Sequence, residues 1–168
     1  MKTSPPSKTN AARLLDSLNI TYELRSYEVD PEDLTAISVA RKIGLPPEQV
    51  FKTLLSQTNT GDHLFAVIPG DAGLDLKKLA HAASAKKAEL ASLKEVEPLT
   101  GYIRGGVTVM GARKPFPVYA DETIELFDII SVSAGQRGLQ VILSPADYLR
   151  ATNATLADLT KSQAPPTA

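Results

Sequence analysis

The pattern of apolar and polar positions predicts two helices and a strand in the first third of the chain. Residues 7–18 carry apolar side chains three and four positions apart, which is the spacing of one helical face. A second helix is expected over residues 35–43 and should end at Gly44, since glycine is common just after a helix and two prolines follow. Between these helices, residues 21–27 alternate apolar and polar side chains and predict a strand.

Alternation further along the chain predicts two β-hairpins and one isolated strand. The turn of the first hairpin is polar and contains Gly61, and the turn of the second contains Gly135 and Gly138. The five expected strands span residues 50–56, 64–68, 118–121, 129–133 and 139–143.

Three more helices are expected among these strands. Asp75 is placed to cap one helix, a weak helix is expected over residues 94–99, and Ser144 followed by Pro145 begins the last one. Short strands interrupted irregularly by helices indicate an α+β fold around a mixed, curved and barrel-like central sheet with surrounding helices. The same irregular order argues against a doubly wound parallel sheet.

Size and composition indicate one soluble domain. The 168 residues are enough to bury a sizeable core, the net charge is −1, and 43% of the residues are hydrophobic. We assign the domain to residues 7–160 and expect flexible ends at residues 1–6 and 161–168. The apolar runs are too short to cross a membrane and the first eight residues hold no secretory signal, so we expect a cytoplasmic protein.

The residue types present narrow the chemistry. The chain has no cysteine, which excludes disulfides, thiolate metal sites and a cysteine nucleophile. His63 and His81 lie in different segments, so neither a metal site nor a serine–histidine relay is supported. If the protein is a hydrolase, we expect it to act by positioning and electrostatics and not through a nucleophile of its own.

The charge is unevenly distributed along the chain. Residues 77–114 contain eight Lys and Arg residues against three Glu residues, although the whole chain is nearly neutral. Such a segment is consistent with a surface for a polyanion, but charge alone favours solvated helix and loop lysines. We find no DNA-reading motif and no aromatic-rich platform for RNA, and we expect neither DNA nor a membrane as a partner.

Lys52 is the most informative single residue. In the predicted strand it shares a face with Val50 and Leu54, and an ammonium group on an apolar face must be solvated, paired with an anion or used chemically. If this face lines a wet cleft, Lys52 is a fixed positive charge for an anionic ligand. The alternative is a lysine that extends its amine to solvent, and the pattern leaves both interpretations open.

Three other features are candidates for a binding site. Gly105-Gly106, with Thr108 close by, could present backbone N–H groups to a carbonyl oxygen, or could form a sharp corner in a sheet. Arg137, in the turn that follows Ser133, could reach a phosphate, or could lie exposed on an ordinary hairpin. Tyr27 could supply a hydroxyl group or a stacking face, or could cover the edge of the core.

Several segments, taken in order, resemble the YbaK family of aminoacyl-tRNA deacylases over roughly residues 8–160. The pattern is most similar to the branch that removes cysteine from mis-charged prolyl-tRNA. The matching segments are residues 27–30, 44–54, 74–80, 85–87, 100–106, 133–139 and 145–147.

The resemblance implies a fold and a reaction. The fold is that of the editing domain inserted in bacterial prolyl-tRNA synthetases, and the reaction is hydrolysis of an aminoacyl ester at the 3′ end of tRNA. Lys52 matches the family's essential lysine, which holds the phosphate of the terminal adenosine. Gly105 matches a backbone position of the aminoacyl pocket. In the cysteine-specific branch the thiol of the substrate attacks its own ester carbonyl, so no metal or organic cofactor is expected.

The resemblance also implies further site residues and partners. The expected partner is the acceptor end of aminoacyl-tRNA, with prolyl-tRNA synthetase as a second partner. Four lysines of the basic segment are candidates for contacts to the tRNA backbone. The expected substrate-binding residues are Tyr27, Gly105, Gly106, Thr108, Ser133, Gly135 and Arg137, and the four lysines are Lys77, Lys78, Lys86 and Lys87.

Two positions depart from the family's pattern and leave the preferred amino acid open. Relatives commonly continue the diglycine with a small or apolar residue and then Ser-Pro, where this chain has Val107-Thr108-Val109. Some relatives carry an acid at the position of Gln140. From the resemblance as a whole, we expect a deacylase that acts on Cys-tRNA(Pro) and also on Cys-tRNA(Cys). A deacylase for alanyl- or seryl-tRNA and a non-catalytic module that binds tRNA or a synthetase are the alternatives.

Overall fold

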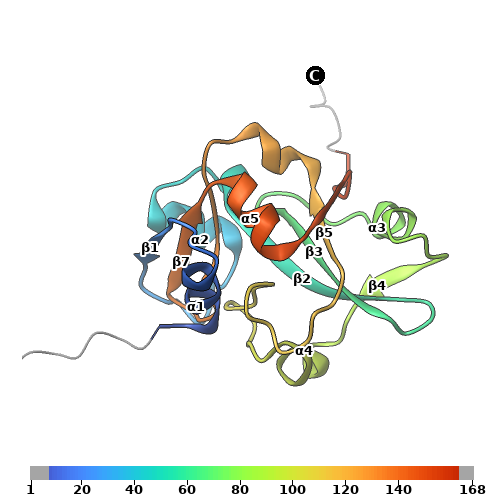
Figure 1. The fold of residues 1–168 in the computed structure, drawn as a ribbon. Helices are drawn as coiled ribbons and strands as arrows, with labels where there is room; N and C mark the ends of the chain where they lie inside the picture. Colours follow the sequence, from blue (N-terminus) through green and yellow to red (C-terminus); the bar gives the residue numbers. More distant parts are fainter. Residues whose placement is uncertain (1–7, 163–168) are drawn as a thin grey trace, which may run out of the picture.

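The computed structural model describes residues 8–162 and arranges short helices around two β-sheets (Figure 1). In Figure 1, α1, α2, β1 and β7 lie at one end of the molecule, and α3 and β4 lie at the other. The helices are α1 (Asn10–Ser17), α2 (Ala36–Ile43), α3 (Leu76–Ala82), α4 (Leu93–Thr100) and α5 (Pro145–Thr152), with 3-10 turns η1 (Pro47–Gln49) and η2 (Glu122–Leu126). The strands are β1 (Glu23–Ser26), β2 (Phe51–Thr58), β3 (His63–Pro69), β4 (Ala88–Leu90), β5 (Val118–Asp121), β6 (Ile130–Ser133), β7 (Leu139–Leu143) and β8 (Thr155–Ala157).

The strands form one antiparallel sheet and one mixed sheet. The smaller sheet has the order β1-β7-β6, and all its pairs are antiparallel. The larger sheet has the order β4-β2-β3-β5-β8, in which β4, β2 and β3 are antiparallel and β3, β5 and β8 are parallel. An isolated parallel bridge between Val50 and Ser131 joins the two sheets.

The α+β class is confirmed, but the expected barrel-like closure is not. The described strands form two sheets that do not close, and these meet at a single residue pair. Before Val50, Pro46 and Pro47 start the 3-10 turn η1, and proline lacks a backbone N–H group to donate to a sheet, so the pairing does not continue in that direction. After Val50, β2 and β6 separate without further strand pairing.

Two hydrophobic clusters lie on opposite faces of the β2–β3 hairpin. Phe51, Leu55, Phe65 and Val67 belong to the larger cluster, which also receives side chains from α1, α5 and the smaller sheet. The intervening positions of β3 belong to a second cluster covered by α3, and Leu54 packs against it. Because side chains alternate along a strand, Lys52 points to the same side as Leu54.

Most helix ends follow the expected capping chemistry. The Asp75 carboxylate accepts hydrogen bonds from the N–H groups of Lys77 (3.0 Å) and Lys78 (3.1 Å) at the start of α3. The Ser144 hydroxyl accepts from the Asp147 N–H (3.2 Å) at the start of α5, and Gly44 ends α2 at φ +79°. Both ends of α2 and the starts of α3 and α5 therefore lie within a residue of their predicted positions.

Three elements differ from the prediction. The strands β4 and β8 were not expected, and α4 continues to Thr100 with Pro98 inside it.

Among the described residues, no helix is both long and apolar enough to span a membrane. The expected flexible ends lie outside the described residues, except for Lys161 and Ser162.

Candidate active site

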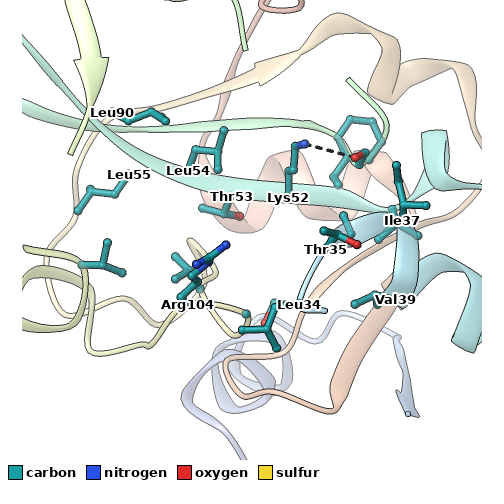
Figure 2. Close-up of a pocket in the computed structure, with 18 of the residues that line it drawn as sticks. Leu34, Thr35, Ile37, Val39, Lys52, Thr53, Leu54, Leu55, Leu90 and Arg104 are labelled. Carbon is teal, nitrogen blue, oxygen red and sulfur yellow. Dashed lines mark hydrogen bonds between the residues drawn. The ribbon is translucent and has the colours of Figure 1, made fainter. Parts of the chain in front are cut away.

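A cavity of about 430 Å³ surrounds an unpaired edge of β2 (Figure 2). The strand β4 pairs only with Ser56–Thr58, and beyond it the Ala91 N–H donates to the Leu55 carbonyl (3.0 Å). Within residues 8–162, the first half of β2 therefore has no neighbouring strand along this edge beyond the bridge at Val50. Side chains from both faces of β2 consequently line the same cavity.

Six parts of the chain build the wall of this cavity. They are α2 with the residues before it, the first half of β2, Gly70 after β3, the segment from β4 to α4, the diglycine corner at Gly105-Gly106, and the β6–β7 hairpin. Most lining side chains are apolar. Lys52 and Arg104 are its charged lining residues, and no Asp or Glu of the described chain lines it. The cavity therefore suits a ligand that combines apolar parts with negative charge.

Lys52 is half-buried at this edge. Its Nζ atom donates to the Gly70 carbonyl at 3.3 Å, which leaves other N–H donors available. Burial lowers the pKa of the Lys52 amine, and the negative charge of Asp71 partly opposes this effect. Figure 2 shows Lys52 and Thr53 on opposite sides of the β2 ribbon, as alternation requires.

The two residues of the diglycine corner have different roles: Gly105 forms part of the cavity wall, and Gly106 makes a packing contact behind it. Gly105 lines the cavity at φ +90°, a conformation that favours glycine. Gly106 does not line it. A Cβ atom at Gly106 would lie 2.9 Å from the Cα of Gln136, so this glycine permits close packing of two loops. The Gly106 N–H donates to the Ile103 carbonyl (2.8 Å). It is therefore not free to bind a ligand, contrary to the prediction.

The β6–β7 hairpin contributes two polar residues to the cavity. Ser133 lines it, and its Oγ accepts a hydrogen bond from the Gly135 N–H (3.2 Å). Gln140 lines it from the adjacent strand, and its Oε1 accepts from the buried Ser131 hydroxyl (2.7 Å). The Ser131 contact fixes the orientation of the Gln140 amide.

The structure brings Lys52, Gly105 and Ser133 together in one cavity, while other expected site residues lie behind its wall. Arg137 Nε donates to the Arg104 carbonyl (2.8 Å) and so supports the corner. Thr108 is fully buried, and its hydroxyl has no hydrogen-bond partner among the described residues. A Cβ atom on Gly135 would lie 2.8 Å from the Tyr102 ring. These three residues act on the shape of the site and do not line it.

Tyr27 also lies outside the cavity lining. It packs against the small cluster of α2 and β7, and the Lys42 ammonium lies 6.0 Å from its ring centroid. This position corresponds to the alternative interpretation of Tyr27, in which the ring covers the edge of the core. A contact to the tRNA outside the cavity stays a prediction.

The four basic candidates differ in their surroundings. Lys78 Nζ lies 3.0 Å from the Asp158 carboxylate and donates to the Thr160 carbonyl (2.7 Å), so its charge is already paired. Lys77, Lys86 and Lys87 are exposed, and none of them forms an ion pair within residues 8–162. These three are therefore better placed than Lys78 to contact a polyanion.

Arg104 lines the cavity, although the sequence predicts only that it adds to the charge of the basic segment. Gln140 had been noted as a departure from the family's pattern, but its place in the cavity had not been expected. The available signal for Arg104 was its position directly before the diglycine.

Comparisons with known proteins identify the family of this chain. Residues 30–151 match the model of the aminoacyl-tRNA editing domain. The chain belongs to this family of editing domains.

The relatives extend the match over nearly the whole chain. EbsC of Enterococcus faecalis, a proposed Cys-tRNA(Pro)/Cys-tRNA(Cys) deacylase, is 40% identical over 162 residues, which cover 96% of this chain and 99% of EbsC. The multifunctional Ser/Thr-tRNA deacylase ProXp-y of Escherichia coli is 37% identical over 89 residues, which cover 52% of this chain and 53% of that protein.

A solved structure supports the fold. The crystal structure of a proposed trans-editing enzyme for prolyl-tRNA synthetase superimposes with a TM-score of 0.77 at 24% identity. The match covers 94% of this chain and 100% of the other.

Proposed function

We propose that this protein is a trans-editing enzyme that hydrolyses the aminoacyl ester of Cys-tRNA(Pro), and of Cys-tRNA(Cys) as a second substrate. The observation that carries the proposal is the cavity in which the half-buried Lys52 amine, Gly105 and Ser133 come together. The similarity to EbsC over nearly the full length of both chains supports the same substrates.

The proposed mechanism uses the chain to bind and orient the substrate. Lys52 holds the phosphate of the terminal adenosine, and the ester lies against the Gly105 backbone. The cysteine thiol then attacks the ester carbonyl. A sulfur–carbon bond forms, the bond to the ribose oxygen breaks, and this oxygen takes the proton that the thiol gives up. The amino acid leaves as a cyclic thioester, and water then opens this ring to give free cysteine.

Two features favour this substrate-assisted reaction. No carboxylate and no imidazole of the described chain lines the cavity, so the wall offers no general base of the usual kind. Holding thiol and ester in a reactive geometry can lower the barrier by about 7 kcal/mol or more in well-oriented intramolecular reactions.

A deacylase for another small aminoacyl-tRNA is the second candidate. The similarity to a Ser/Thr-tRNA deacylase over half the chain favours it, and Gln140 presents a neutral amide in the cavity wall. Because Thr108 is buried, the altered stretch after the diglycine would change specificity through packing and not through direct contact.

The proposal extends to partners and surfaces. The protein would bind the acceptor end of aminoacyl-tRNA and dock on prolyl-tRNA synthetase. Lys77, Lys86 and Lys87 would contact the tRNA backbone outside the cavity. Residues 7–160 would form one deacylase domain that acts in the cytoplasm.

A panel of aminoacyl-tRNAs on one tRNA body tests the proposed function. We expect cysteine to be released faster than alanine or serine, with no change when a chelator is present. Faster cleavage of an ester without a thiol would support the second candidate. Tight tRNA binding without turnover on any ester would contradict both and indicate a binding module.

A further inference from the structure

The cavity contains a second positive charge that the proposed mechanism does not use. Arg104 lines the cavity together with Lys52, and Figure 2 shows its side chain extending from the corner loop toward β2 on the side of Thr53. Lys52 lies on the other side of the β2 ribbon. The two cations therefore approach the open edge of β2 from opposite sides.

The backbone around Arg104 is held in place. Its carbonyl accepts the hydrogen bond from Arg137 Nε (2.8 Å), and the next residue, Gly105, turns the chain at φ +90°. Gly106 then packs closely against the backbone of Gln136. The Arg104 side chain thus projects from a braced corner and not from a loose loop.

The guanidinium of Arg104 lacks a protein partner in the described structure. The exposed Arg104 side chain forms no hydrogen bond or ion pair within residues 8–162. Among the six other arginines, four donate to protein oxygens, and Arg13 and Arg41 do not but lie outside the cavity lining. No acidic side chain lines the cavity to neutralise it. The four arginines with oxygen partners are Arg25, Arg113, Arg137 and Arg150.

The chemistry of an aminoacylated RNA end limits what Arg104 can bind. The carboxyl group of the amino acid is esterified, and its α-ammonium group would be repelled by both cations. The remaining formal negative charges are the phosphates. A guanidinium matches a phosphate in geometry, since it offers several N–H donors in one plane.

We propose that Lys52 and Arg104 bind two successive phosphates of an RNA 3′ end, one from each side of β2. This inference rests on the proposed function for its substrate class. It deepens that function, because the recognised substrate is then an aminoacylated end of at least two nucleotides and not an aminoacylated nucleotide alone.

Binding of short nucleotides tests the inference without requiring turnover. The probes are 5′-AMP, with one phosphate, and 5′-phosphorylated CpA, with two, titrated calorimetrically into wild type and Arg104→Gln. We expect the variant to lose about tenfold in affinity for the dinucleotide and less than twofold for AMP. The salt dependence of dinucleotide binding should also flatten, by about 0.7 in the slope of log K against log salt concentration.

Two further variants serve as controls. Arg13 is exposed on α1 and does not line the cavity, so Arg13→Gln should bind both probes as wild type does. Arg104→Lys keeps the positive charge and should retain most of the affinity for the dinucleotide. Unchanged thermal unfolding of each variant shows that the fold is intact.

The outcomes separate this inference from the proposed function. An equal loss for both probes, or no loss for either, in Arg104→Gln would overturn the second phosphate contact. If the probe dependence holds but wild type releases no amino acid from any aminoacyl-tRNA, the two-phosphate site stands and the hydrolytic function is wrong.

Discussion

At the scale of single residues, Lys52 carries a charge that the fold itself does not neutralise. The amine is half-buried, its contact to the Gly70 carbonyl is long, and burial lowers its pKa. A half-buried positive charge without an anionic partner is unfavourable for folding, and its presence indicates a ligand that pairs with it. Removing the charge should therefore abolish function without lowering the stability of the fold.

We expect Lys52→Met to unfold at the same or a higher denaturant concentration than wild type at neutral pH. The difference should stay below about 1 kcal/mol, because the amine is partly solvated. The folded-state pKa is lowered, so between that value and the ordinary lysine value the unfolded state binds more protons than the folded state. Wild-type stability should thus rise toward that of the variant as the pH rises through this window.

Urea unfolding of both proteins at several pH values provides the measurement. A variant that is clearly less stable than wild type at neutral pH would show that Lys52 supports the fold. The same lowered pKa predicts that phosphate binding by wild type weakens at a lower alkaline pH than for an ordinary lysine.

At the scale of elements, the site depends on contact between the diglycine corner and the β6–β7 turn. The corner places Gly105 and Arg104 in the cavity wall, and the turn carries Arg137, which holds the corner. Gly106 permits this contact because it has no Cβ atom. The corner should therefore be sensitive to one added methyl group.

We expect Gly106→Ala to destabilise the protein by about 1–3 kcal/mol and to reduce deacylation, because the new methyl group would meet the Gln136 backbone. Gly73→Ala is the matched control. There the added Cβ atom would meet only the Lys161 side chain, at 3.3 Å, and that chain can move. Thermal unfolding and initial rates would compare the two, and equal effects would contradict the packing role of Gly106.

Elements whose signals lie within their own sequence were the ones that could be predicted. Both hairpins and the capped helices α2, α3 and α5 carry turn glycines or capping side chains at their ends. The strands β4 and β8 are three residues long and are held by pairing with β2 and β5. Because this pairing depends on the surrounding fold, it produces no recognisable alternation of apolar and polar residues within the strand itself.

At the scale of the whole molecule, the cavity is assembled from segments that lie far apart in the chain. Alternation on one strand singled out Lys52, and the order of family motifs pointed to Gly105 and Ser133. Neither pattern reveals that β4 stops short and opens the β2 edge. For the same reason Arg104 was missed, and residues behind the wall, such as Thr108, were taken as contacts.

In the proposed mechanism, cleavage depends above all on the Lys52 charge, which holds the end of the substrate. The direct measurement is the initial rate of cysteine release from Cys-tRNA(Pro) by wild type, Lys52→Gln and the exposed control Lys8→Gln. We expect a loss of at least about 100-fold for Lys52→Gln, with the fold intact and the control unchanged. Wild-type activity in Lys52→Gln would contradict the account.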